Sequence, residues 1–176
     1  ASPSPWYVLM EVADAAESTL LRLLDVAVAD GWVADAAIAQ SEAQRQSFWH
    51  VRESLSESQK HEGGSIKHDV SVPVSHIPAF IAEAAAAVTR FMPGARPVPF
   101  GHMGDGNLHF NISQPAVADK AKFLAAWDAM NDVVYAVVQK YDGSISAEHG
   151  IGVQKRERMR SIKSPVELDM MRGIKT

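Results

Sequence analysis

The chain has 176 residues, 47% of them hydrophobic, which is enough for one domain with a sizeable core. Its formal net charge is -4 and its basic residues are dispersed, so nucleic acid is not expected as a partner. The absence of cysteine excludes disulfides, thiolate metal ligands and cysteine nucleophiles. Any metal must therefore be bound through nitrogen and oxygen.

The sequence contains no targeting or membrane-spanning pattern. No apolar run approaches the roughly 20 residues that a bilayer requires, and the first residues lack the basic region and apolar core of a signal peptide. We therefore expect a cytoplasmic protein, with any membrane association made through segments that lie outside this sequence. The chain starts in a strand-like run and stops inside a helical pattern without a cap, which indicates a piece of a longer protein.

Strand and helix patterns alternate along the first third of the chain. Residues 6–14 are rich in β-forming side chains, and residues 16–31 place leucines and valines at helical spacing. Residues 33–41 alternate weakly, as in a second strand. They lead into a long polar helix over residues 41–60, for which Ser41 is the candidate N-cap.

Strand and helix patterns also alternate along the rest of the chain. Residues 65–74 alternate, with Ile66, His68 and Val70 on an apolar face, which predicts a half-buried strand. A helix over 75–94, a β-hairpin within 99–115, an amphipathic helix over 118–143, a glycine-containing loop over 144–152 and a last helix complete the chain. This order favours an α+β fold, with an antiparallel sheet and helices packed on one face.

The hairpin places two histidines around an Asp-Gly pair at positions 105–106. If this pair forms a two-residue turn, His102 lies directly opposite His109, with Cβ atoms about 4.5–5.5 Å apart. Alternation adds Asn107 and Asn111 to the same polar face. Two imidazoles at this separation can share one metal ion, although a histidine pair can also simply fill a polar surface.

A second polar segment favours the metal hypothesis. Glu148 and His149 stand just before a Gly-x-Gly turn, where small residues let the backbone approach a ligand closely. A carboxylate joining two neutral imidazoles is a common ligand set for a divalent ion that keeps an open position for water or substrate.

Four stretches, GHMGDGNLHFNI, SISAEHGIG, WHVRESLSES and KHDVSVPVSHIPAFI, resemble the C-terminal substrate domain of FAD-linked oxidases of the vanillyl-alcohol oxidase superfamily. The resemblance is to the group of D-lactate dehydrogenase, the glycolate oxidase D-subunit and D-2-hydroxyglutarate dehydrogenase, and it runs from about residue 45 to the end. It implies a ferredoxin-like α+β fold. Residues 1–176 would form the C-terminal substrate or cap domain, and the partner would be an N-terminal FAD-binding domain that is absent from this chain.

The resemblance also implies roles for four polar residues. In the family, the residues that match His102, His109 and Glu148 hold a divalent ion, often zinc, which binds the hydroxyl and carboxylate groups of a 2-hydroxy acid. The histidine that matches His149 is the expected general base. It takes the hydroxyl proton while hydride passes from the α-carbon of the substrate to FAD.

Further matches concern the rest of the substrate and the cofactor. Arg52, Ser56 and Lys67 match positions that contact substrate carboxylates in the 2-hydroxyglutarate branch. Arg52 and Ser56 are four residues apart and share a helix face. The alternative is that this face is an ordinary solvated one. On the polar face of the hairpin, we expect Asn111 to contact substrate and Asn107 to contact the cofactor.

The function expected from the resemblance is oxidation of a D-2-hydroxy acid of the lactate, glycolate or 2-hydroxyglutarate type to the 2-keto acid by an FAD-dependent oxidoreductase. The substrate and the electron acceptor are not specified by the sequence. This chain alone is expected to be inactive, because the FAD-binding domain is missing. The alternative is a non-catalytic interaction or assembly domain of a larger oxidase complex.

Overall fold

The computed structural model describes residues 3–13 and 17–175, which fall into two compact units, Ala1–Ser58 and Gln59–Thr176. The first unit is helical, and the second contains the sheet and most of the buried apolar side chains. The helices of the first unit are α1 (Glu17–Ala29), α2 (Glu42–Glu53) and α3 (Leu55–Ser58).

The first unit confirms the predicted cap but not the predicted strands. The Ser41 hydroxyl accepts a hydrogen bond from the Gln44 amide at 3.3 Å, as an N-cap should. Residues 6–13 and 33–41 form no strand, so both strand predictions are wrong there; residue 14 lies outside the described residues. A strand needs a hydrogen-bonded partner, and no described segment of this unit pairs with either stretch.

The long helix predicted over residues 41–60 is interrupted. The α2 helix ends at Glu53, Ser54 is its C-cap, and α3 begins at Leu55. Arg52 and Ser56 therefore lie on two successive helices, which corrects the prediction of one continuous helix face for them.

Within the described residues, the second unit contains an antiparallel sheet, five α-helices and two short 3-10 helices. Its elements, in chain order, are η1 (Gln59–Glu62), β1 (Ser65–Ile66), β2 (Asp69–Ser71), η2 (Val74–His76), α4 (Ile77–Phe91), β3 (Arg96–His102), β4 (Asn107–Ser113), α5 (Lys120–Ala125), α6 (Trp127–Lys140), α7 (Arg156–Ile162) and α8 (Pro165–Lys175).

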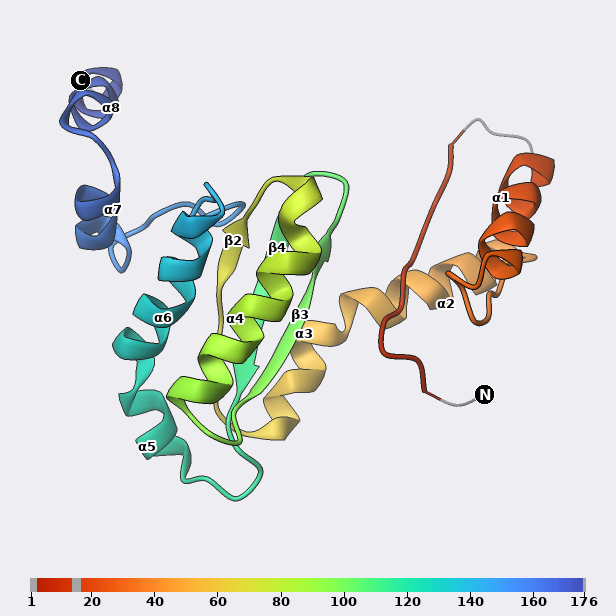
Figure 1. Ribbon diagram of the computed structural model, residues 1–176, viewed down its shortest axis with the longest axis horizontal. Helices are drawn as coiled ribbons and strands as arrows, with labels where there is room; N and C mark the ends of the chain where they lie inside the picture. The colour runs from red at the N-terminus through yellow and green to blue at the C-terminus, as the bar shows by residue number, and fades with distance from the viewer. Residues whose placement is uncertain (1–2, 14–16, 176) are drawn as a thin grey trace. The chain divides into compact units, whose positions relative to one another are not determined.

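The β4 strand lies at the centre of the sheet. It pairs antiparallel with β3 along one edge and with β1 and β2 along the other. Figure 1 shows α4 and α6 side by side across one face of this sheet, and the two helices contact each other. The predicted α+β class, with an antiparallel sheet and helices on one face, is confirmed.

Alternation along β4 separates the core from a polar face. Leu108, Phe110 and Ile112 are all at most 2% exposed and belong to the core, where the Phe110 ring meets Phe80 of α4 edge-on at 5.7 Å. Burying each such side chain contributes on the order of 2 kcal/mol, so this face supplies much of the stability of the unit. The neighbouring residues Asn107, His109 and Asn111 point to the other face.

The outer edge of β3 is protected by prolines. The amides of Phe110 and Gln114 donate to carbonyls on the β1–β2 side, so the odd-numbered amides of β4 face β3. In this register, the backbone nitrogens of Pro97 and Pro99 point away from β4. Because proline has no N–H, no hydrogen bond between β3 and β4 is lost at these two positions. The edge consequently offers few donors to an additional strand.

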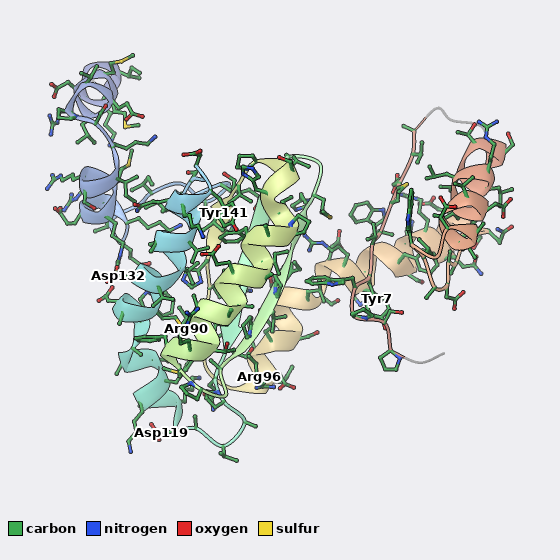
Figure 2. The ribbon with its side chains drawn as sticks, viewed as in Figure 1. Tyr7, Arg90, Arg96, Asp119, Asp132 and Tyr141 are labelled. Carbon is green, nitrogen blue, oxygen red and sulfur yellow. The ribbon has the colours of Figure 1, made fainter. Side chains whose placement is uncertain are left out.

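Polar contacts at the periphery tie the helices and strands together. Tyr141, just after α6, donates its hydroxyl to Glu83 of α4 at 2.9 Å, and Arg96 at the start of β3 donates to Glu62 at 2.7 Å (Figure 2). None of the described helices is both long enough and apolar enough to cross a membrane.

His68 is part of the core, on the apolar face predicted for residues 65–74. It is 1% exposed, one ring nitrogen (Nδ1) lies 2.8 Å from the carbonyl oxygen of Phe110, and the ring meets Tyr135 edge-on. Burial disfavours the imidazolium and lowers the pKa of His68 to about 4. The side chain is therefore neutral in the folded protein near pH 7.

The burial of His68 predicts that the free energy of unfolding decreases as the pH is lowered. Between pH 6.5 and about 4, His68 takes up a proton in the unfolded state but not in the folded state, so the free energy of unfolding should decrease by at most about 3 kcal/mol. His68→Phe should show a smaller decrease, because phenylalanine binds no proton. Thermal unfolding midpoints between pH 7 and 5 test this, with His61→Phe, at an exposed histidine, as the control. Equal pH dependence in His68→Phe and wild type would refute the prediction.

Candidate active site

The hairpin that carries the two histidines has a longer loop than predicted. Residues 103–106 connect β3 and β4, and His102 pairs with Asn107 while His109 pairs with Phe100. The predicted register, with His102 directly opposite His109, is wrong by two residues. Because side chains alternate with a period of two, this shift leaves both histidines on the same face as diagonal neighbours, with ring centroids 6.3 Å apart.

The Asp-Gly pair does not form a two-residue turn. Such a turn of the usual hairpin type needs positive φ at both positions, but of this pair only Gly106 has one, at +79°. Asp105 instead accepts a hydrogen bond from the Asn107 amide at 3.0 Å, a side-chain contact that closes the wider loop.

The loop after α6 brings a carboxylate to the two histidines. The Nε2 atom of His102 lies 3.8 Å from one Glu148 carboxylate oxygen, and the Nε2 atom of His109 lies 3.7 Å from the other. One ligand atom from each of the three residues falls within a group that spans 4.8 Å. The structure thus gathers the three residues that the sequence suggested as metal ligands.

The geometry of this cluster fits a divalent ion. Two ligand atoms 2.0–2.1 Å from a tetrahedral zinc ion lie about 3.3 Å apart. The two histidine–glutamate separations would contract by about half an ångström, and any ligand atoms as far apart as the 4.8 Å span of the group by about 1.5 Å. The His102 and Glu148 side chains are about half exposed, which leaves the cluster open to a further ligand. Two imidazoles and one carboxylate can therefore hold a metal with an open coordination position.

His149 stands beside the cluster. Its ring stacks on that of His109, with centroids 5.9 Å apart and planes inclined by 27°, and its side chain is 70% exposed. The Nδ1 atom lies 3.4 Å from an Asp69 carboxylate oxygen, so Nε2 is the nitrogen that is directed away from Asp69. An imidazole in this position can exchange a proton with a molecule bound at the cluster.

Asp69 was not among the predicted site residues, yet it holds the site loop. Its Oδ2 atom accepts hydrogen bonds from the backbone amides of Glu148 and His149 at 2.9 and 2.8 Å. Burial raises the pKa of Asp69, but the two amide hydrogen bonds together lower it further, and the net pKa is below the usual value. The carboxylate is thus stabilised as an anion beside His149.

Lys155 is a second residue that the sequence analysis missed. Its ammonium group donates to the carbonyl oxygen of Ile145 at 2.7 Å and lies 3.5 Å from that of Asp69, and burial lowers its pKa. It therefore links the start of the site loop to β2. A signal for Asp69 existed in the sequence, because it shares the polar face of residues 65–74, and Lys155 belongs to a basic run at residues 154–160.

The two asparagines lie on the same face of β4 as His109 and are buried. Asn111 donates its side-chain amide to Gln59 at 2.7 Å. Both side-chain polar atoms of Asn107 are buried without a hydrogen-bond partner among the described residues. An unpaired buried amide costs about 1–3 kcal/mol, so Asn107 opposes folding in this arrangement.

The predicted carboxylate-binding residues are more dispersed. Lys67, between β1 and β2, is exposed and lines a cavity of about 250 Å³ together with Lys155 and Arg158. Arg52 and Ser56 belong to the first unit, whereas the histidine cluster belongs to the second. The three therefore do not form one group within either unit.

Comparison with known proteins identifies the family. The sequence pattern of the FAD linked oxidases, C-terminal domain, matches residues 1–176. The chain belongs to this family of FAD linked oxidase C-terminal domains. The match includes the first forty residues, which the sequence motifs alone had not covered.

Individual relatives of this FAD linked oxidase domain carry one name. The chain is 41% identical over 174 positions to a D-2-hydroxyglutarate dehydrogenase of Stutzerimonas stutzeri, covering 97% of this chain and 37% of that protein. It is 37% identical to a probable mitochondrial D-2-hydroxyglutarate dehydrogenase of Oryza sativa subsp. japonica, and the match covers 99% of this chain and 30% of that protein. It is 32% identical to the mitochondrial D-2-hydroxyglutarate dehydrogenase of Rattus norvegicus, and the match covers 98% of this chain and 32% of that protein. The chain thus spans about a third of the length of these relatives.

The hairpin loop of this FAD linked oxidase domain provides a test of the site scaffold. A Cβ atom at Gly106 would overlap the carbonyl oxygen of Val72, and the residue has positive φ, whereas a Cβ at Gly104 would meet no atom within 4 Å. Gly106→Ala should lower the free energy of unfolding by at least about 2 kcal/mol, and Gly104→Ala by less than about 0.5 kcal/mol. Urea unfolding of both variants measures the difference, and similar losses would contradict the described loop.

Proposed function

We propose that the full-length protein is an FAD-dependent dehydrogenase that oxidises a D-2-hydroxy acid to the 2-keto acid, and that this chain supplies the substrate side of its active site. The observation that carries the proposal is the convergence of His102, His109, Glu148 and His149 on one polar sheet face of an FAD linked oxidase domain. The names of the relatives favour D-2-hydroxyglutarate over lactate or glycolate as the substrate.

Each polar residue has a role in this proposal. His102, His109 and Glu148 would hold a divalent ion, which we propose to be zinc; when bound, it supplies a positive charge that binds the α-hydroxyl and carboxylate oxygens and makes the hydroxyl more acidic. His149 accepts the hydroxyl proton at Nε2, because Nδ1 faces Asp69. FAD, bound mainly by the N-terminal part of the protein, would accept the hydride from the α-carbon.

The remaining predicted residues serve recognition. Arg52, Ser56 and Lys67 are each proposed as substrate-binding residues, because two cations and a hydroxyl donor suit a substrate that carries carboxylates. Asn111 would orient the substrate through the part of its amide that Gln59 does not use. The unpaired amide of Asn107 would meet the cofactor.

Metal content is the first test. The full-length protein, dialysed against metal-free buffer and reloaded with zinc, should retain about one zinc ion per chain by elemental analysis. His102→Ala and His109→Ala should retain almost none, because two protein ligands do not suffice for a stable site. His61→Ala removes an exposed histidine outside the cluster and should bind zinc as the wild type does. Equal zinc contents in all four proteins would refute the metal assignment.

The role of His149 is tested by flavin reduction. Mixing the anaerobic full-length protein with D-2-hydroxyglutarate in a stopped-flow instrument should bleach the flavin, and His149→Ala should slow this step by about 10²–10⁴-fold, the usual loss on removal of a general base. His61→Ala is again the control. Reduction of His149→Ala at the wild-type rate would overturn the base assignment. Absence of reduction in the wild type with 2-hydroxyglutarate, lactate and glycolate would favour the non-catalytic alternative.

A further inference from the structure

Asp69 occupies a position in the site that neither a metal ligand nor a substrate contact explains. It lies on β2 directly opposite His109, and its side chain is 6% exposed. We infer that Asp69 is a positioning residue, which fixes the Glu148–His149 segment and orients the His149 imidazole for proton transfer. This inference rests on the proposed function.

The first support is the number of contacts that meet at one oxygen atom. Oδ2 of Asp69 accepts the amide hydrogens of Glu148 and His149, at 2.9 and 2.8 Å, and lies 3.4 Å from Nδ1 of His149. One carboxylate oxygen thus binds the backbone amides of Glu148 and His149 and also lies next to the His149 ring. A small displacement of Asp69 would move all of them together.

The second support is the way in which the rest of the loop is anchored. Its first residues are held by the Ser71–Ser144 pair, whose two backbone hydrogen bonds measure 3.0 and 2.8 Å, and by Lys155, which donates to the Ile145 carbonyl. Farther along, Gly150 has positive φ, a conformation that favours glycine. The reactive residues lie between these two points, and Asp69 is the acceptor for both of their amides.

The third support is the chemistry that the position requires. An apolar residue of similar size would avoid the desolvation penalty of Oδ1, which is buried without a hydrogen-bond partner among the described residues. It would also leave the amides of Glu148 and His149 without their acceptor. A buried acceptor at this position is therefore what keeps the Glu148–His149 segment in place.

Chemically, the contact selects one state of the base. The carboxylate oxygen 3.4 Å from Nδ1 favours the tautomer that carries its proton on Nδ1, which leaves the lone pair on Nε2, the nitrogen available to the substrate hydroxyl. When Nε2 accepts the proton, the imidazolium that forms lies next to the negative charge of Asp69, which stabilises it. Asp69 keeps its own charge throughout, and the proton remains on His149.

Two variants of the full-length flavoprotein separate the charge of Asp69 from its hold on the backbone. Asp69→Asn keeps the size and one carbonyl-type acceptor for the two amides but removes the negative charge. Asp69→Ala removes the acceptor as well. Asp25→Asn, at an exposed aspartate in α1, is the matched control.

Three measurements are made on each protein: the limiting rate of flavin reduction by D-2-hydroxyglutarate, the substrate dissociation constant from the same titration, and hydrogen exchange of residues 145–151. Asp69→Asn should lower the limiting rate by about 10²-fold or more, with the dissociation constant and hydrogen exchange near wild-type values. Asp69→Ala should lower the rate and also accelerate exchange in this segment. Asp25→Asn should resemble the wild type.

The outcomes separate this inference from the proposed function. If the wild type is reduced normally and Asp69→Asn is reduced at the same rate, Asp69 has no positioning role. If Asp69→Asn lowers the rate of flavin reduction and accelerates hydrogen exchange of residues 145–151 to the same extent, Asp69 has a merely structural role, and the inference is overturned as well. A wild-type protein whose flavin is not reduced by any of the three hydroxy acids would overturn the proposed function itself.

Discussion

The pairing of β4 along both of its edges is the constraint on which the second unit depends. With β3 on one side and β1–β2 on the other, the strand has no freedom to rotate, and its side chains alternate strictly between two faces. Phe110 and its neighbours fill the core beneath α4 and α6, while His109 lies on the opposite face. A slip of one residue would exchange the two sets, so core packing also sets the register of the site.

The polar face concentrates groups that a merely stable protein would avoid. Asn107 has an unpaired buried amide, and Asp69 has a buried carboxylate oxygen without a partner among the described residues. Each such group opposes folding by about 1–3 kcal/mol, which the apolar face must offset. Other described residues, among them the core residue His68, also have a buried polar atom without a partner, so only part of this cost falls beside the histidine cluster.

Two of the four site side chains are carried by strands, and the other two are carried by a loop. His102 and His109 stand at or near the end of paired strands, whereas Glu148 and His149 stand on a loop that is fastened to β2 by side-chain and backbone hydrogen bonds. Rigid strands fix the first pair, and the carboxylate of Asp69 gives the second pair comparable order. A loop held in this way can combine defined geometry with the exposure that a substrate requires.

The sequence by itself determined the α+β class, the apolar face that includes His68, and the polar residue types that meet at the site. These features depend on local periodicity and on the chemistry of side chains, both of which can be read from neighbouring residues. The family resemblance added the expected roles of the same residues. Even the error in the hairpin register left the faces correct, because it amounted to two residues.

Only the tertiary structure decided which extended segments become strands, how long the hairpin loop is, and what holds His149. Residues 6–13 have a strand-like composition, but a strand forms only where another segment supplies hydrogen bonds. The contacts of Asp69 join residues 79 and 80 positions apart, through backbone amides that carry no side-chain signature. Interactions of this kind leave no trace in local periodicity, since they exist only once the strands and the loop have come together.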